Sequence, residues 1–99
     1  MVQGTKLPVR IYEKCDVDYE VVNIRVSEGE QVEWRSTGQA FSIDFESSPF
    51  QDDHFDVPAG GCIGSGPVKT GTPYACYHYT IQSRTDPSMK ADPDVNIKK

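Results

Sequence analysis

Two side chains with soft donor atoms stand close together in this sequence, Cys76 and His78. Residues i and i+2 of a β-strand point to the same side of a sheet, so a thiol and an imidazole at this spacing could bind a metal ion there. The competing interpretation is that both are half-exposed strand residues opposite the face that carries the tyrosines. We favour this second interpretation.

Other constellations that could do chemistry are incomplete. Asp52, Asp53 and Asp56 flank His54, but the Asp-x-Asp-x-Asp-Gly spacing of a calcium loop is absent, which indicates a solvated acidic loop. Only His54 and His78 could serve as imidazole bases, and no Gly-x-Ser-x-Gly motif frames a serine nucleophile. The glycine-rich run 60–67 lacks the Lys and Ser or Thr of a phosphate-binding loop. We therefore expect that the protein is not an enzyme.

The cysteines are Cys15, Cys62 and Cys76, which permit at most one intramolecular disulfide. We expect free thiols, and the paired Cys-x-x-Cys spacing of zinc sites is absent. The N-terminus has no apolar segment of signal-peptide length, so the sequence predicts no export signal. A mature periplasmic or secreted fragment is the alternative left open, and localisation is unknown.

The length and the net charge of the chain narrow the number of domains and the kinds of partner that we expect. A chain of 99 residues predicts one domain, because separate cores form only in chains beyond about 250 residues. Asp and Glu number 15 against 10 Lys and Arg, and the net charge of -5 disfavours binding to nucleic acid. No apolar run approaches the ~20 residues that span a bilayer. The partner, a protein or a small molecule, and the oligomeric state are not indicated.

The elements that would position these side chains are β-strands, because apolar and polar residues alternate with period two. The alternation is clear around 7–11, 22–26, 32–35, 41–45, 76–81 and 95–97, and no window has helical spacing. Residues 27–30 supply turn chemistry that predicts a hairpin between the second and third runs. From 46 to 72 we expect mostly loop, with weak strand character at Phe55 with Val57 and at Ile63 with Val68.

About seven short strands in such a chain predict an all-β, two-sheet sandwich with Greek-key connections. An immunoglobulin domain is the generic alternative, since Cys15, Trp34 and Cys76 follow its Cys, Trp, Cys order. Cys15 lies outside the clear strand runs, which counts against it. We expect Trp34, Phe41, Phe45, Tyr79 and Ile81 in the core.

Two stretches resemble the cupredoxins, the sandwich family of plastocyanin and azurin. "VNIRVSEGEQVEW", from Val22 to Trp34, is similar to the family's strand, glycine turn and strand. Residues 71–99 resemble its Gly-x-Tyr-x-Tyr penultimate strand and its closing strand, as found in copper-less members that end in Asp-Pro and a short Val and Ile strand. The resemblance implies a single cupredoxin-like sandwich domain over residues 1–99.

The resemblance also allows the copper ligands to be compared by position. Blue copper is held by two imidazoles, one thiolate and a weak thioether. The family's first His falls at Phe41 and its Cys at Ile81, no His lies between 83 and 86, and Met89 falls in the thioether region. This implies a member without the copper ligands and without a cofactor. Phe41 and Ile81 should then lie near each other at one end of the sandwich, as a vestigial site filled with hydrocarbon.

An alternative metal set keeps the family's order of ligand types: His54, Cys76, His78 and Met89. Against it, His54 precedes Cys76 by only 22 residues, and Cys76 and His78 lie within the strand instead of the loop after it. The five tyrosines indicate core and rim positions, with Tyr74 and Tyr77 beside the glycine-rich loop as a binding rim. The sequence thus favours a non-catalytic binding or structural module. The alternatives are a metal-binding or electron-transfer protein using Cys76 and His78, and a small enzyme of unknown chemistry.

Overall fold

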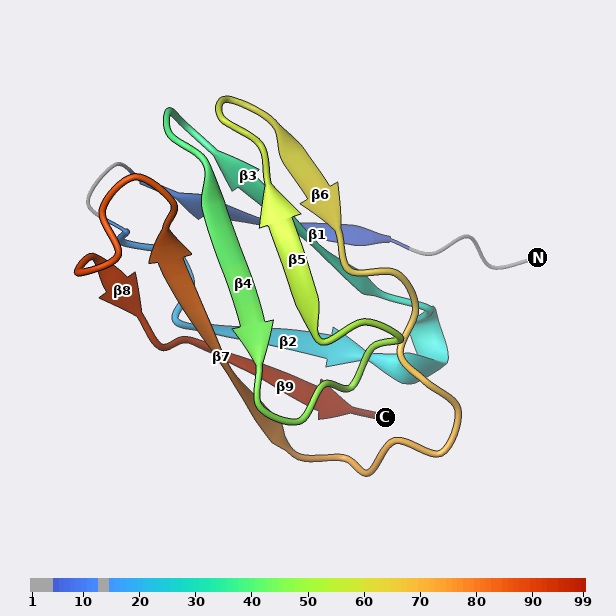
Figure 1. Ribbon diagram of the computed structural model, residues 1–99. Coiled ribbons are helices and arrows are strands. Elements are labelled where there is room, and N and C mark those ends of the chain that lie inside the picture. The colour runs from blue at the N-terminus through green and yellow to red at the C-terminus, as the bar shows by residue number, and fades with distance from the viewer. Residues whose placement is uncertain (1–4, 13–14) are drawn as a thin grey trace.

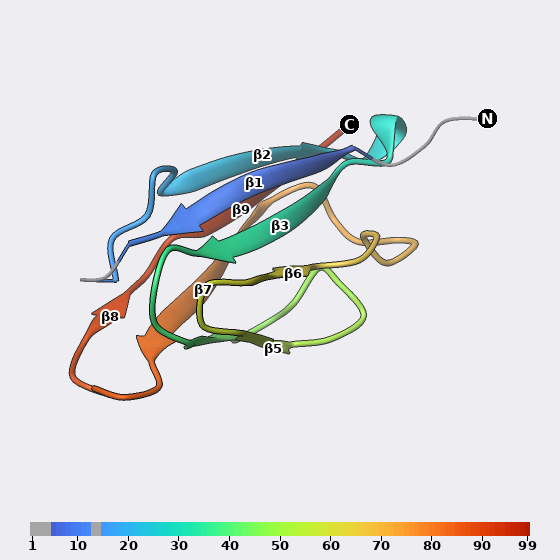
Figure 2. The same cartoon turned by 90° about the horizontal axis from the view of Figure 1, so that it is seen from above.

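The computed structural model describes residues 5–12 and 15–99, which form a two-layered β-sandwich (Figures 1 and 2). A three-stranded sheet has the order β1-β3-β6, and a six-stranded sheet has the order β2-β9-β7-β4-β5, with β8 pairing with β7. The sandwich expected from the alternation is therefore confirmed. The strands are β1 (Lys6–Ile11), β2 (Val21–Arg25), β3 (Gln31–Ser36), β4 (Phe41–Phe45), β5 (His54–Val57), β6 (Cys62–Gly64), β7 (Cys76–Ser83), β8 (Lys90–Ala91) and β9 (Asp94–Lys98).

Pairing in both sheets joins strands that are distant in sequence. β1 runs parallel to β3, and β2 runs parallel to β9. In the large sheet β7 is the central strand, and it pairs antiparallel with both β4 and β9. The start of β4 and the end of β7 consequently lie at the same end of the sandwich, with Phe41 opposite Ser83.

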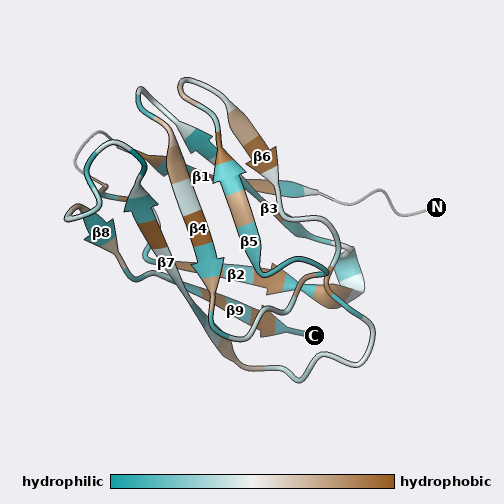
Figure 3. Ribbon diagram, viewed as in Figure 1, coloured by the Kyte–Doolittle hydropathy of each residue, from teal (hydrophilic) through white to brown (hydrophobic). Residues whose placement is uncertain are grey.

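The core lies between the sheets and follows the alternation of each strand (Figure 3). Trp34 on β3 is fully buried, and its ring contacts the rings of Phe45, Phe50, Phe55 and Tyr79. Aromatic pairs at such separations add to the stability that area burial provides. All five side chains expected in the core from the sequence are buried.

The hairpin expected around residues 27–30 is wrong. Arg25 and Glu30 are bonded across this turn, through Glu30 N–H to the Arg25 carbonyl at 3.3 Å, and Gly29 adopts the left-handed φ of 67°. The turn also contains a short 3-10 helix, Val26–Glu28. However, β2 and β3 belong to different sheets, so the turn carries the chain from one layer to the other.

Between 46 and 72, the weak strand character expected at Phe55 with Val57 and at Ile63 is confirmed, because two short strands form there. β5 contains Phe55 and Val57, both buried, and pairs with β4; β6 contains Ile63 and pairs with β3. Phe50 and Val68 form an isolated bridge within the same region. These strands are short, so their alternation is too brief to stand out among the surrounding glycines and prolines.

Within the described residues, no helix is long and apolar enough to cross a membrane.

Candidate functional site

Phe41 and Ile81, the positions that the resemblance assigns to the first His and the Cys, lie on the inner face of adjacent strands. Phe41 pairs with Ser83 and Ile81 pairs with Ile43, so Phe41 and Ile81 are diagonal neighbours. Both side chains are fully buried, with 0% exposure. Neither side chain has an atom that can coordinate a metal ion.

A hydrogen-bond network closes this end of the sandwich. The hydroxyls of Ser83 and Thr85 both donate to the Gln39 side-chain oxygen, the second at 2.8 Å. The Ser36 hydroxyl donates to the Gln39 carbonyl, and Arg84 N–H donates to the Ala40 carbonyl at 3.2 Å. The β3–β4 connection and the turn after β7 are therefore fastened to each other above the buried hydrocarbon.

Cys15 is buried at the same end of the sandwich, although it is not among the residues that the sequence predicts in the core. Its thiol donates to the Ile81 carbonyl at 3.4 Å, and its exposure is 1%. Its φ of 66° is unusual for a residue with a side chain, and a Cys15 N–H to Tyr12 carbonyl bond of 2.8 Å helps to hold it. Burial, and secondarily the charge of Asp16, raises the pKa of this thiol. Cys15 is therefore a neutral core residue; its position in an irregular segment gave no periodic signal.

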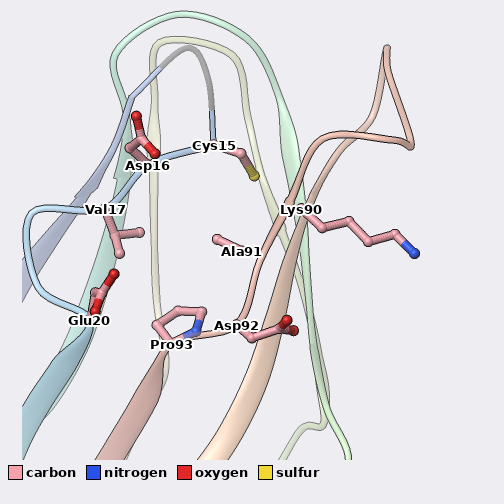
Figure 4. A pocket seen from close by; sticks show the side chains of 8 residues that line it. All are labelled: Cys15, Asp16, Val17, Glu20, Lys90, Ala91, Asp92 and Pro93. Carbon is pink, nitrogen blue, oxygen red and sulfur yellow. The ribbon is translucent and has the colours of Figure 1, made fainter.

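Beside Cys15 is a cavity of about 320 Å³ between the 15–20 segment and the 90–93 segment (Figure 4). Asp16, Glu20 and Asp92 supply carboxylates around it, while the Lys90 side chain extends away. Cys15 is itself one of the residues that line this cavity, although it is only 1% exposed to bulk solvent.

His54 lies on the outer face of the large sheet, between two carboxylates. Its Nδ1 is 2.6 Å from Asp44 on β4, and its Nε2 is 3.0 Å from Asp56 on β5. Arg84 Nη1 donates to the same Asp56 oxygen at 2.5 Å. The hydrogen bond to Asp44, followed by the bond to Asp56 and the charges of both, raises the pKa of His54 despite an opposing desolvation effect. The interpretation of this stretch as a solvated loop is corrected for His54 and Asp56, which are strand residues in a cross-strand ion row.

Cys76 and His78 are exposed on the outer face of β7, as the favoured interpretation expected. The Cys76 thiol faces the Asn96 amide oxygen at 3.6 Å, and His78 Nδ1 bonds to Asp94. Both partners come from β9.

The alternative metal set is divided among separate places. Cys76 and His78 lie on the part of β7 that pairs with β9. His54 lies on β5, which pairs with β4 on the other side of β7, and Met89 is half-buried against the core. Among residues 5–12 and 15–99, no group of three or more His, Cys, Asp or Glu side chains is arranged to hold a metal ion. All three thiols are free.

Tyr74 and Tyr77, the two tyrosines expected at a binding rim, differ in how exposed they are. Tyr74 is 62% exposed, whereas Tyr77 is half-buried and its hydroxyl donates to the Pro73 carbonyl at 2.7 Å. Tyr77 lines a shallow cavity of about 330 Å³ with residues 47–48 and 69–73, and none of the glycine-rich residues 60–67 lines it. Tyr77 is therefore used within the fold, and Tyr74 presents its ring to solvent.

Comparison with known proteins finds solved structures with a similar fold. No family model matches the sequence, and no curated protein matches it. A methionine-to-alanine mutant of amicyanin with Cu(I) superposes with a TM-score of 0.60 at 14% identity, over 93% of this chain and 81% of that one. A purple cupredoxin from Nitrosopumilus maritimus superposes with a TM-score of 0.59 at 13% identity, over 92% of this chain and 98% of that one. Identities this low support a statement about architecture alone: this chain has the cupredoxin fold.

Proposed function

We propose that this protein is a non-catalytic binding or structural module built on the cupredoxin fold, without a blue-copper centre. The observation that carries the proposal is the pair of fully buried hydrocarbon side chains, Phe41 and Ile81, at the positions assigned to two ligands. Close-packed side chains leave no open coordination position between the strands.

The nearby donor atoms also do not fit blue copper. Copper in this geometry needs two imidazoles and a thiolate, and both His54 and His78 bond to carboxylates on the outer face. The thiol at this end belongs to Cys15, whose raised pKa favours the protonated form over the thiolate that binds copper. Met89 supplies a thioether, which by itself is too weak a ligand to hold copper.

We place the partner-facing surface at the end of the sandwich that carries Tyr74. Among residues 5–12 and 15–99, Tyr74 is the most exposed of the large apolar residues, and it lies in the loop before β7. Loops at the end of a sandwich are a common recognition surface, and a tyrosine offers both an apolar ring and a hydroxyl to a partner.

Copper retention tests the proposal. The purified protein is incubated with Cu(I) or Cu(II), dialysed against a chelator, and assayed for bound copper and for a shift in Tm. We expect no retained copper and no rise in Tm, because a ligand that binds the folded state would stabilise it. One retained equivalent that is lost in Cys76→Ser and in His78→Gln, but kept in Cys62→Ser, would favour the metal-binding alternative instead.

A further inference from the structure

A continuous row of ionisable side chains crosses the outer face of the large sheet. It runs from Asp44 on β4 through His54 and Asp56 on β5 to Arg84, the residue that follows β7. The four side chains are each about half exposed, at 55%, 48%, 56% and 51% in that order. The row lies on the surface and is open to exchange of protons with water.

The arrangement requires His54 to carry a proton on both ring nitrogens. Each nitrogen faces a carboxylate oxygen, at 2.6 Å and 3.0 Å, and a carboxylate can only accept a hydrogen bond. A neutral imidazole has one N–H, so its second nitrogen would present a lone pair to a carboxylate. Loss of the proton therefore breaks one of the two links.

The charged groups around His54 come from three elements. Asp44 on β4 and Asp56 on β5 are anionic, and Arg84 after β7 is cationic but already bonded to Asp56. The other side chains of the shallow cavity beside His54 are neutral. The two carboxylates therefore have the largest electrostatic effect on His54, and this agrees with its raised pKa.

The row adds to the contacts that hold β5, whose Phe55 and Val57 are buried in the core, and the turn after β7, which is also bonded to the β3–β4 connection. β5 is the edge strand of the large sheet and pairs there with β4 alone. The turn after β7 is fastened locally, by Met89 N–H to the Asp86 carbonyl at 3.0 Å and by the Gln82 amide to the Pro87 carbonyl at 3.0 Å. Asp56 and Arg84 join this turn to β5.

We propose that Asp44, His54, Asp56 and Arg84 form a proton-dependent clamp, closed when His54 is protonated, that holds edge strand β5 to β4 and to the turn after β7. Loss of the proton opens one link and loosens β5 and this turn while the core stays folded. The clamp does not depend on the proposed function, since it holds whether or not the protein binds copper.

Two measurements on the intact protein test the clamp. The first is an NMR titration of both imidazoles in the folded protein and in urea. We expect His54 to titrate at higher pH in the folded state than in the unfolded chain, and Asp44→Asn to lower its midpoint. An unshifted His54, or a midpoint that Asp44→Asn leaves in place, would overturn the proposal.

The second measurement is amide hydrogen exchange, expressed as protection factors, on both sides of the His54 midpoint. We expect protection of the β5 amides and of residues 84–86 to fall severalfold above the midpoint, with the β3 amides unchanged. His54→Gln cannot be protonated and should have low, pH-independent protection in these segments. His78→Gln is the matched control, since His78 is also bonded to a carboxylate on the outer face, and it should keep the pH-dependent change. Equal protection on both sides of the midpoint, or loss of the change in both variants, would contradict the clamp.

Discussion

The inner and outer faces of β4 and β7 differ sharply in chemistry although they belong to the same two strands. The inner face carries Phe41, Ile43, Phe45, Tyr79 and Ile81, all buried. The outer face of the large sheet carries both imidazoles, each bonded to at least one carboxylate. Both imidazoles are thus separated from the place where the resemblance expects a metal, whereas the inner face of β7 carries the buried hydroxyl of Tyr79.

Removing the largest inner side chain should have the largest effect. Trp34→Ala should lower the free energy of unfolding by about 3–5 kcal/mol, because truncation leaves a cavity among four aromatic rings. Tyr74→Ala, at an exposed rim position, should change it by no more than about 0.5 kcal/mol. Urea unfolding measures both, and equal midpoints would contradict the assignment of inner and outer positions.

A matched pair on β7 sharpens the contrast within a single strand. Ile81→Ala should cost about 2–5 kcal/mol, since Ile81 is fully buried beside Phe41. Thr80→Ala removes a half-exposed hydroxyl that donates to Asp92 at 3.1 Å, and it should cost less than about 1.5 kcal/mol. Thermal or urea unfolding of the two variants checks the order, and a larger loss for Thr80→Ala would mean that the faces are reversed.

One hydrogen bond within the inner face can be tested separately. Trp34 Nε1 donates to the Tyr79 hydroxyl at 3.2 Å, and burial is the main cause that raises the pKa of Tyr79 above its usual value. Tyr79→Phe keeps the ring but leaves the buried indole N–H without this acceptor, which should cost about 1–3 kcal/mol. A loss near zero in urea unfolding would show that the hydroxyl adds nothing to stability.

The smallest expected effect is the pH dependence that His54 adds to stability. Because its folded pKa is raised, the ion row stabilises the fold below the unfolded pKa of about 6.5, and this contribution disappears as pH rises through the folded pKa. The row is exposed, so the contribution should stay below about 1 kcal/mol. This contribution is measured by urea unfolding of the native protein and of His54→Gln between about pH 5 and 9. The window lies above the ordinary pKa of Asp, about 4, and spans that of His, about 6.5. A difference that grows with rising pH would reverse the sign and contradict the account.

Period-two alternation was sufficient to predict the strand faces, because burial on one side of a sheet imposes it on residues such as Ile43 and Ile81. The pairing of β2 with β9, instead of β3, could not be predicted from the local turn at Gly29. The row through His54 depends on the register of β4 against β5, where Asp44 lies opposite His54. The run of acidic residues around His54 does not by itself indicate which residue of a neighbouring strand lies opposite it. Cys15 was missed for a similar reason, since its contact with Ile81 joins residues 66 positions apart.

The visible absorption spectrum of the protein with one equivalent of Cu(II) tests the central claim most directly, because a thiolate bound to Cu(II) produces an intense band. We predict that the native protein shows no such band, since Phe41 and Ile81 fill the inner end of β4 and β7 with hydrocarbon. An intense band that persists in Cys76→Ser and Cys62→Ser but is lost in Cys15→Ser would contradict the account, because it would place a copper thiolate at the end of the sandwich that Phe41 and Ile81 fill.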